Sequence, residues 1–146
     1  MDNFSMAKSY VRQARERLKH AGEALESGNY AYVVRQSQEA VELALKASLR
    51  IVGVEPPKWH DVGPALKANK EKFPAWFRDQ IGRLALISRL LRHEREPSMY
   101  GDEESGIPPN HPYGPEDARW ALEGASYVVE TVEELLREAE ERRARS

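Results

Sequence analysis

The stretch from Ser37 to Gly53 most constrains the fold, because its apolar residues recur with the period of a buried helix. One side of this helix would carry apolar and small residues: Val33, Ser37, Ala40, Val41, Ala44, Leu45, Ser48, Leu49 and Val52. This spacing is typical of a helix packed in a core. The other side carries Gln38, Glu39, Glu42, Lys46 and Arg50, and Glu42 and Lys46 are spaced for a surface ion pair. We therefore expect the central helix of a bundle.

Similar stripes, meaning apolar residues at helical spacing along one side, predict three further long helices and one short helix. With the central one, the expected ranges are 3–26, 30–52, 61–68, 74–95 and 115–139. Asn3 or Ser5 can cap the first helix and Asp61 the short one, while Pro74 suits the first turn of the next. Pro97 would close that helix. Because short turns make neighbouring helices antiparallel, we predict an all-α, antiparallel up-and-down four-helix bundle with an additional short helix.

The remaining segments carry residues that end helices. Gly28 and Gly53 stand directly after the first two stripes, where a left-handed residue often ends a helix. The window 96–114 holds four prolines and three glycines, which predicts a flexible loop without regular structure. The charged residues 140–146 are expected to fray in solvent. At 146 residues the chain should form a single domain, 1–146.

Charge and composition limit the possible functions. The chain has 22 basic and 24 acidic residues, so no global basic field can hold nucleic acid and any such site must be local. Cysteine is absent, which excludes disulfides, thiolate metal sites and cysteine nucleophiles. The sequence shows neither a signal peptide nor a membrane span, so we expect a cytoplasmic protein without membrane contact. The histidines lack metal-ligand spacing, and we expect neither a metal nor a cofactor.

The densest group of chemically active side chains lies where the predicted 74–95 helix ends: Arg89, Arg92, His93, Arg95, Tyr100 and Asp102. Cations near a helix C-terminus are favoured by the helix dipole, so one interpretation is a solvated helix end followed by a loop. The other interpretation is a ligand-binding site for an anion or phosphate. Guanidinium groups supply paired donors, and Tyr100 supplies a hydroxyl or a stacking face. The residues alone leave both interpretations open.

Several stretches also stand in a recognisable order: G-N-Y at 28–30, S-Q-E-A-V-E-L-A-L-K-A at 37–47, W-H-D at 59–61, R-E-P-S-M-Y-G-D at 95–102, Tyr113, and E-D-A at 116–118. In this order they resemble the HEPN family (higher eukaryotes and prokaryotes nucleotide-binding domain). The resemblance implies an all-α bundle that usually dimerises. For many members it also implies a metal-independent RNase, often a toxin paired with a small nucleotidyltransferase-like antitoxin.

The RNase motif of that family is an Arg followed, after a short gap, by a His. In such enzymes the Arg stabilises the charge of the phosphorane, and the His moves a proton while the RNA 2′-hydroxyl attacks. In this chain Tyr100 stands where the His would follow Arg95, and a Tyr with an ordinary pKa near 10 is a poor general base. The catalytic candidates are therefore Arg95, His93 and Tyr100, with the family motif not intact. His60 matches a loop His of the family and is either a further site residue or a packing residue.

These observations leave three hypotheses. The leading one is a nucleotide- or RNA-binding HEPN-like protein that forms a homodimer and acts with a nucleotidyltransferase-like partner, as in a toxin–antitoxin system. The second is a metal-independent RNase with an altered Arg/His motif. The third is a non-enzymatic structural dimer or adaptor.

Overall fold

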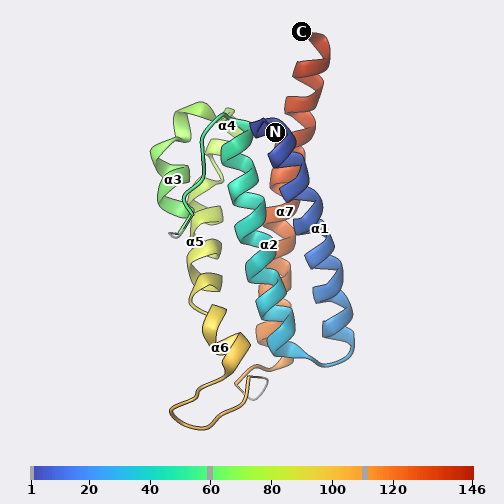
Figure 1. The fold of residues 1–146 in the computed structure, drawn as a ribbon, viewed down its shortest axis with the longest axis vertical. Coiled ribbons are helices and arrows are strands. Elements are labelled where there is room, and N and C mark those ends of the chain that lie inside the picture. The colour runs from blue at the N-terminus through green and yellow to red at the C-terminus, as the bar shows by residue number, and fades with distance from the viewer. Residues whose placement is uncertain (1, 59–60, 110–111) are drawn as a thin grey trace.

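The computed structural model describes residues 2–58, 61–109 and 112–146, and at Arg95, Glu96 and Met99 it describes the backbone only. These residues form an antiparallel helical bundle (Figure 1). Its long helices are α1 (Asn3–Glu26), α2 (Tyr30–Ile51), α5 (Ile81–Arg92) and α7 (Pro115–Arg145). The short elements are α3 (Gly63–Ala68), the 3₁₀ turn η1 (Lys70–Lys72), α4 (Ala75–Arg78) and α6 (Arg95–Tyr100). The predicted all-α bundle is confirmed.

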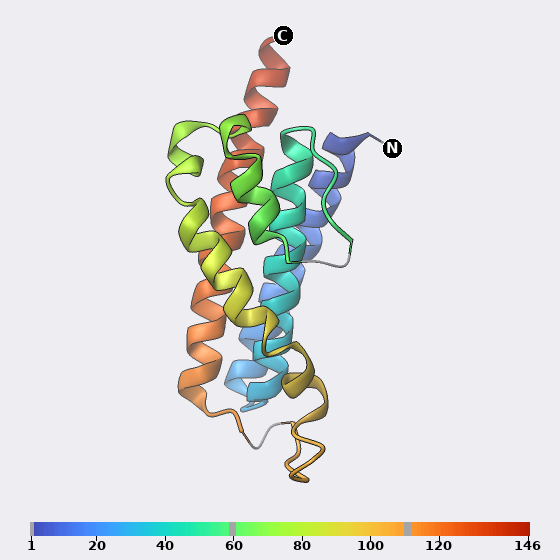
Figure 2. The ribbon, with the colours of Figure 1, turned by 90° about the vertical axis from the view of Figure 1, so that its left-hand side faces the viewer.

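Helix α2 lies at the centre of the bundle, as its stripe predicts. It packs against both α1 and α7, and the shorter α5 and α6 cover its remaining side (Figures 1 and 2). The side chains of Ala40, Ala44 and Leu45 are fully buried, and the predicted ion pair between Glu42 and Lys46 is present at 3.8 Å. One residue of the predicted outer side is placed differently: Gln38 is only 3% exposed, because α5 and α6 pack on this side of α2.

The first two helix ends follow the glycine signals. Gly28 and Gly53 both have a φ of 80°, the left-handed conformation that an L side chain rarely adopts. The N-terminal cap was predicted at the wrong residue, since neither Asn3 nor Ser5 caps α1. The side chain of Asp2 does so instead, because its Oδ1 accepts a 2.8 Å hydrogen bond from the backbone N–H of Ser5.

The single helix predicted over 74–95 is wrong, because the chain bends twice within that range. Pro74 precedes the short α4, the backbone turns, and α5 starts again at Ile81. Aromatic packing holds α4 at its own angle: Phe73 and Phe77 stack with ring centroids 4.6 Å apart in the core. Trp76 Nε1 also donates a 2.9 Å hydrogen bond to Glu138 on α7.

The expected loop over 96–114 contains more structure than its composition predicts. Helix α6 occupies its first residues, and Pro97 lies in the first turn of α6, where its missing N–H costs no helical hydrogen bond. Asp102 and Ile107 then pair through two backbone hydrogen bonds of 2.7 and 2.9 Å. Gly101 makes this turn possible, since a Cβ there would collide with the carbonyl oxygen of Ile107.

Two other boundaries differ from the prediction. Helix α3 begins at Gly63, and Asp61 is not its N-cap. Asp61 Oδ1 instead accepts hydrogen bonds from Ser88 Oγ at 3.0 Å and from Gly63 N at 3.2 Å, so it ties α3 to α5. At the other end, α7 continues to Arg145 instead of stopping near residue 139. No helix within the described ranges is long and apolar enough to cross a membrane.

Candidate functional site

The predicted ligand-binding residues lie along α5, α6 and the turn that follows them. Helix α5 ends at Arg92, His93 forms its C-cap, and α6 begins at Arg95. Cationic side chains in the last turn of α5 are favoured by the carbonyl dipoles there. The helical period nevertheless points these side chains in different directions, so closeness in sequence does not make them one site.

Arg92 points inward, toward the central helix. Its Nη1 lies 3.3 Å from Oε1 of Glu42 on α2, and both side chains are less than one-third exposed. The same Glu42 oxygen lies 3.8 Å from Lys46 Nζ. Arg92 therefore joins α5 to α2 in a partly buried ion pair, which holds the bundle together and leaves this guanidinium turned away from the outer surface of α5.

Arg89 points outward, toward α3. It borders a hollow of about 370 Å³ between α3 and α5, which Lys67 also lines. One carboxylate, that of Asp61, lies at the same hollow, and one of its oxygens is occupied by Ser88 and by the N–H of Gly63. His93 is exposed one turn farther along α5 than Arg89. This is the only part of the candidate set in which two of its basic residues share an outward-facing surface within the described ranges.

Tyr100 and Asp102 lie beyond α6, away from that surface. Tyr100 is 58% exposed, and with Asp102 it lines a hollow whose other charged groups, among the side chains that the structure describes, are Glu103 and Glu104. Asp102 Oδ1 accepts a 3.2 Å hydrogen bond from the backbone N–H of Ser105, and this bond lowers the pKa of the Asp102 carboxyl. The surroundings of Tyr100 and Asp102 are thus acidic.

Some of the sequence-based candidates fall where the structure gives no side-chain placement. Arg95 contributes its backbone to the start of α6, and its side chain lies outside the described part. His60, its neighbour Trp59, and His111 also lie outside the described residues. Within the rest of the chain, no group of three or more His, Asp or Glu side chains is arranged to hold a metal ion.

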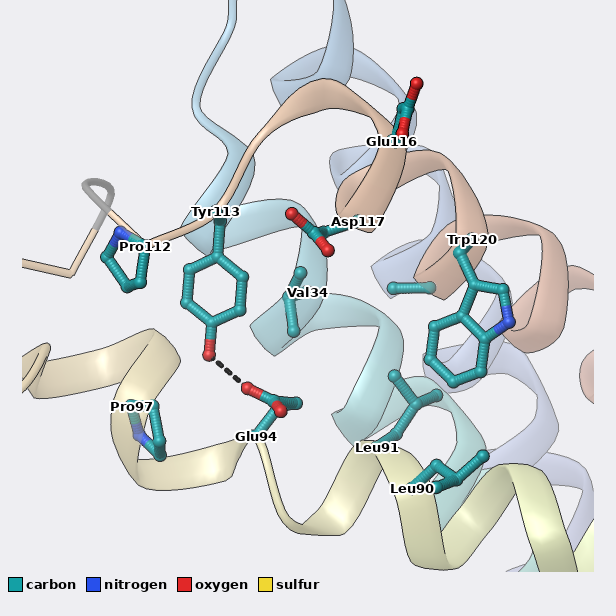
Figure 3. A pocket seen from close by; sticks show the side chains of 11 residues that line it. Val34, Leu90, Leu91, Glu94, Pro97, Pro112, Tyr113, Glu116, Asp117 and Trp120 are labelled. Atoms are coloured by element: carbon teal, nitrogen blue, oxygen red, sulfur yellow. Dashed lines mark hydrogen bonds between the residues drawn. The ribbon is translucent and has the colours of Figure 1, made fainter.

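A further pocket involves residues that the sequence did not single out as a site. It has a volume of about 590 Å³ and opens between the α5–α6 turn and the start of α7 (Figure 3). Tyr113 and Glu94 form one wall, and Trp120 stands across from them beside Leu90 and Leu91. Tyr113 was noted only as a family match. No local pattern in the sequence marks Tyr113 as a pocket residue, because its partner Glu94 lies 19 residues earlier in the chain.

A hydrogen bond shapes the acidic wall of this pocket. Tyr113 Oη donates to Glu94 Oε2 at 2.5 Å. Burial, and then this bond to Glu94, raise the pKa of the Tyr113 hydroxyl well above its ordinary value, so Tyr113 stays a donor at neutral pH. Asp117, on the first turn of α7, accepts a 2.9 Å hydrogen bond from the N–H of Gly114. The lining residues include a third acid, Glu116, and no Lys, Arg or His among the described ones.

A comparison with protein-family models shows to which family this chain belongs. The model of the HEPN domain matches residues 7–141, which is most of the sequence. The chain belongs to the HEPN domain family. A solved structure similar to this HEPN domain is that of TT1696 from Thermus thermophilus, with 27% sequence identity and a TM-score of 0.69. The match covers 88% of this chain and 96% of that one. No curated protein matches the sequence.

Membership in the family gives the candidate residues a context. This HEPN domain keeps its Q-E-A-V-E-L-A-L-K-A stretch in the buried centre of the bundle, where it serves packing. The position at which the sequence lacks the family's His, Tyr100, lies at the exposed end of α6. In this HEPN domain, Lys67 and Arg89 line one hollow and Tyr100 lines another, so these basic side chains and the exposed ring of Tyr100 belong to different surfaces.

Proposed function

We propose that this HEPN domain binds RNA or a nucleotide through the outward surface formed by Lys67, Arg89 and His93, here called the basic surface. The observation that carries the proposal is the hollow that Lys67 and Arg89 share. In the described part of the chain neither of these two side chains is engaged in an ion pair. Guanidinium and ammonium groups beside one concave surface are the donors that phosphate oxygens require.

The chemistry of the neighbouring groups supports a phosphate ligand. Asp61 is the one carboxylate among the described residues that line the hollow, and its hydrogen bonds with Ser88 and Gly63 hold it against α3 and α5. Arg92 is neutralised by Glu42 and adds little to the outer field. With a formal net charge of −2, the chain depends on such a local patch for any contact with nucleic acid.

A titration with fluorescently labelled single-stranded RNA tests this site. We expect Arg89→Ala and Lys67→Ala each to weaken binding severalfold. Each should also make the slope of log affinity against log salt concentration shallower by about 0.7, the value for one phosphate of a single strand. Arg12→Ala is the matched control, since Arg12 is exposed on α1, on the far side of the bundle from α3 and α5 (Figure 1). Equal RNA affinity of the Arg89→Ala, Lys67→Ala and Arg12→Ala variants would contradict the assignment.

A second candidate function is metal-independent RNA cleavage at the same surface. The observation that favours it is His93, an exposed imidazole one helical turn from Arg89. An imidazole can move a proton near neutral pH while a neighbouring cation stabilises phosphate charge. RNA incubated with the protein in EDTA tests this. Cleavage by the wild-type chain that disappears in His93→Ala supports the RNase function. If the wild-type chain leaves the RNA intact, it is not an RNase, and binding without cleavage is the function that remains.

We further propose that the chain acts as a homodimer in a paired system with a nucleotidyltransferase-like protein, of the toxin–antitoxin type. HEPN domains often form dimers, and Leu86, Leu90 and Trp120 stand exposed on neighbouring helices of this one. The nucleotidyltransferase-like partner is supported by the family resemblance alone. Light scattering coupled to size-exclusion chromatography tests the dimer.

Co-purification of the chain with a co-expressed nucleotidyltransferase-like protein tests the pairing, and two separate elution peaks would argue against it. If the chain binds neither RNA nor a nucleotide, the result supports the third hypothesis, a non-enzymatic structural dimer or adaptor.

A further inference from the structure

A groove runs between α5 and α7, with carboxylates at one end and Arg83 beside Glu123 at the other. The pocket of Tyr113 and Glu94 lies at one end, and a second hollow lined by Arg83 lies at the other. The two hollows share Leu90 and Trp120. The middle is apolar and open to solvent: Leu86 is 45%, Leu90 41% and Trp120 48% exposed. Exposed apolar residues gathered in one place commonly mark an interaction surface.

The outward side of α5 has a pattern that is complementary to itself. Arg83, Leu86 and Leu90 follow at i, i+3 and i+7 on α5, and Glu94 follows at i+11 in the turn just past the end of α5. Leu90 lines the hollow of Arg83 as well as the pocket of Glu94, so the cation, the two leucines and the carboxylate lie along one side. Arg83 and Glu94 each lie roughly 8 Å along the axis from the midpoint of the pattern, taking 1.5 Å per residue. If a second α5 lies antiparallel about that midpoint, Arg83 of each copy faces Glu94 of the other. A twofold interface requires this kind of self-complementarity.

The acidic end of the groove also restricts what can cover it. Glu94, Glu116 and Asp117 line the pocket, and none of its described lining residues is cationic. An apolar surface laid over these carboxylates would remove water from them without supplying a counter-charge, which is unfavourable. Among the described lining residues no cation offsets these carboxylates, so an occupant that combines apolar side chains for Leu90 and Trp120 with a cation for the pocket fits the groove best.

We propose that the occupant is a second copy of this chain, packed antiparallel along α5, whose Arg83 enters the acidic pocket beside Glu94. This rests on the proposed homodimer and names its surface and register. The guanidinium carbon of Arg83 lies 4.2 Å from the ring centroid of Tyr127 on α7, so the side chain of Arg83 leans from α5 toward α7. Glu123 lines the same end as Arg83 and would approach the acidic pocket of the second copy, so Arg83 is the cation that offsets both.

Exchanging the two charges tests the register. Arg83→Glu and Glu94→Arg are prepared as separate variants of the full chain, and dimer dissociation constants are measured by sedimentation equilibrium. Each single variant alone would place like charges together at both symmetric contacts, so we expect dimerisation about 100-fold weaker. Mixing the two variants should restore a heterodimer to within about tenfold of the original affinity, because both contacts then pair opposite charges.

Further variants keep the test independent of folding. Glu94→Gln removes the charge but still accepts the hydrogen bond from Tyr113, and we expect it to weaken the dimer about tenfold. Glu123→Gln is the matched control, which should leave the affinity equal or tighter because it removes a like charge. Helix content by circular dichroism must stay unchanged in every variant.

The outcomes separate this inference from the proposals on which it depends. A monomeric wild-type chain would overturn both the homodimer and the register. A dimer that withstands both single exchanges, or one that mixing does not restore, would overturn the register while leaving a homodimer through another surface. The basic surface is tested separately by the RNA affinity of Lys67→Ala and Arg89→Ala, since neither residue lies at the proposed contact of Arg83 with Glu94.

Discussion

The hydroxyl of Tyr113 donates a 2.5 Å hydrogen bond to the carboxylate of Glu94, and this contact joins the segment before α7 to the turn between α5 and α6. Both residues line the acidic pocket. We expect Tyr113→Phe to lower the free energy of unfolding by about 1–2 kcal/mol, because Glu94 loses its donor in a partly buried place. Urea denaturation measures this. Tyr100→Phe is the control and should change little, since the Tyr100 side chain is mostly exposed.

The same hydroxyl gives stability a dependence on alkaline pH. The pKa of Tyr113 in the folded chain is raised above its ordinary value of 10.0, first by burial and then by Glu94. Its contribution is therefore complete below the unfolded pKa and is lost as pH rises above it, because the unfolded chain releases the proton more easily. Unfolding free energies at about pH 8 and about pH 10.5 should fall more for the wild type than for Tyr113→Phe. Parallel losses in both proteins would contradict this origin.

The ion pair between Arg92 and Glu42 should be measurable as a coupling between α5 and α2. A double-mutant cycle with Arg92→Gln and Glu42→Gln is expected to give about 0.5–1.5 kcal/mol, since both side chains are partly buried. The pair of Arg142 and Glu138 on α7 is the comparison. It is more exposed, and its coupling should stay below about 0.5 kcal/mol. RNA affinity should survive Arg92→Gln if this residue serves the fold.

Two glycines should respond in opposite ways to alanine. Gly22 lies within α1 with no neighbouring atom within 4 Å of the added Cβ, so Gly22→Ala should stabilise the chain by about 0.5–1 kcal/mol through helix propensity. Gly101 has a φ of 75° and no room for a Cβ. Gly101→Ala should destabilise by more than about 2 kcal/mol. Thermal unfolding of both variants checks the contrast, and shifts of the same sign would refute it.

The hydrogen bonds of Asp61, beside the basic surface, lead to a prediction about stability. Asp61→Ala removes the acceptor for Ser88 and for the N–H of Gly63. We expect it to cost about 1–3 kcal/mol of stability, because Ser88 Oγ is left without its partner at a buried position. Ser88→Ala should cost less, since it removes the donor as well as its bond. A cycle of both changes, followed by urea denaturation, would show whether the two residues act as one contact.

Local pattern was sufficient for the long helices. The stripe of α2 and the glycines at 28 and 53 predicted its ends within one residue, because backbone and packing preferences agree there. The break between α4 and α5 could not be predicted, since the apolar period continues through Phe77 and Ile81 without interruption. It depends on tertiary contacts, in particular that of Trp76 with Glu138 on α7. Pro97 predicts a helix end from the sequence, but it stands in the first turn of α6.

The candidate site was less accessible to sequence reasoning. Arg92 follows Ile81 and Ser88 at i+11 and i+4, so its helical phase already placed it on the buried side of α5. Grouping Arg92 with the other basic residues by closeness in sequence ignores this helical phase. No local sequence pattern predicts the acidic pocket, because its two main groups, Glu94 and Tyr113, are 19 residues apart. They meet through a tertiary contact between the turn before α6 and the segment before α7. Lys67 entered the basic surface for the same reason, through the packing of α3 on α5.

The backbone pair of Asp102 and Ile107 closes one short span within the connection between α6 and α7. Residues 103–106 form a tip that is exposed throughout. Loop-closure entropy grows only with the logarithm of length, so each doubling of such a tip costs about 0.6 kcal/mol. A peptide tag or fluorescent label can therefore be inserted at this tip with little penalty, which gives the molecule a handle on the end opposite its two termini (Figure 1).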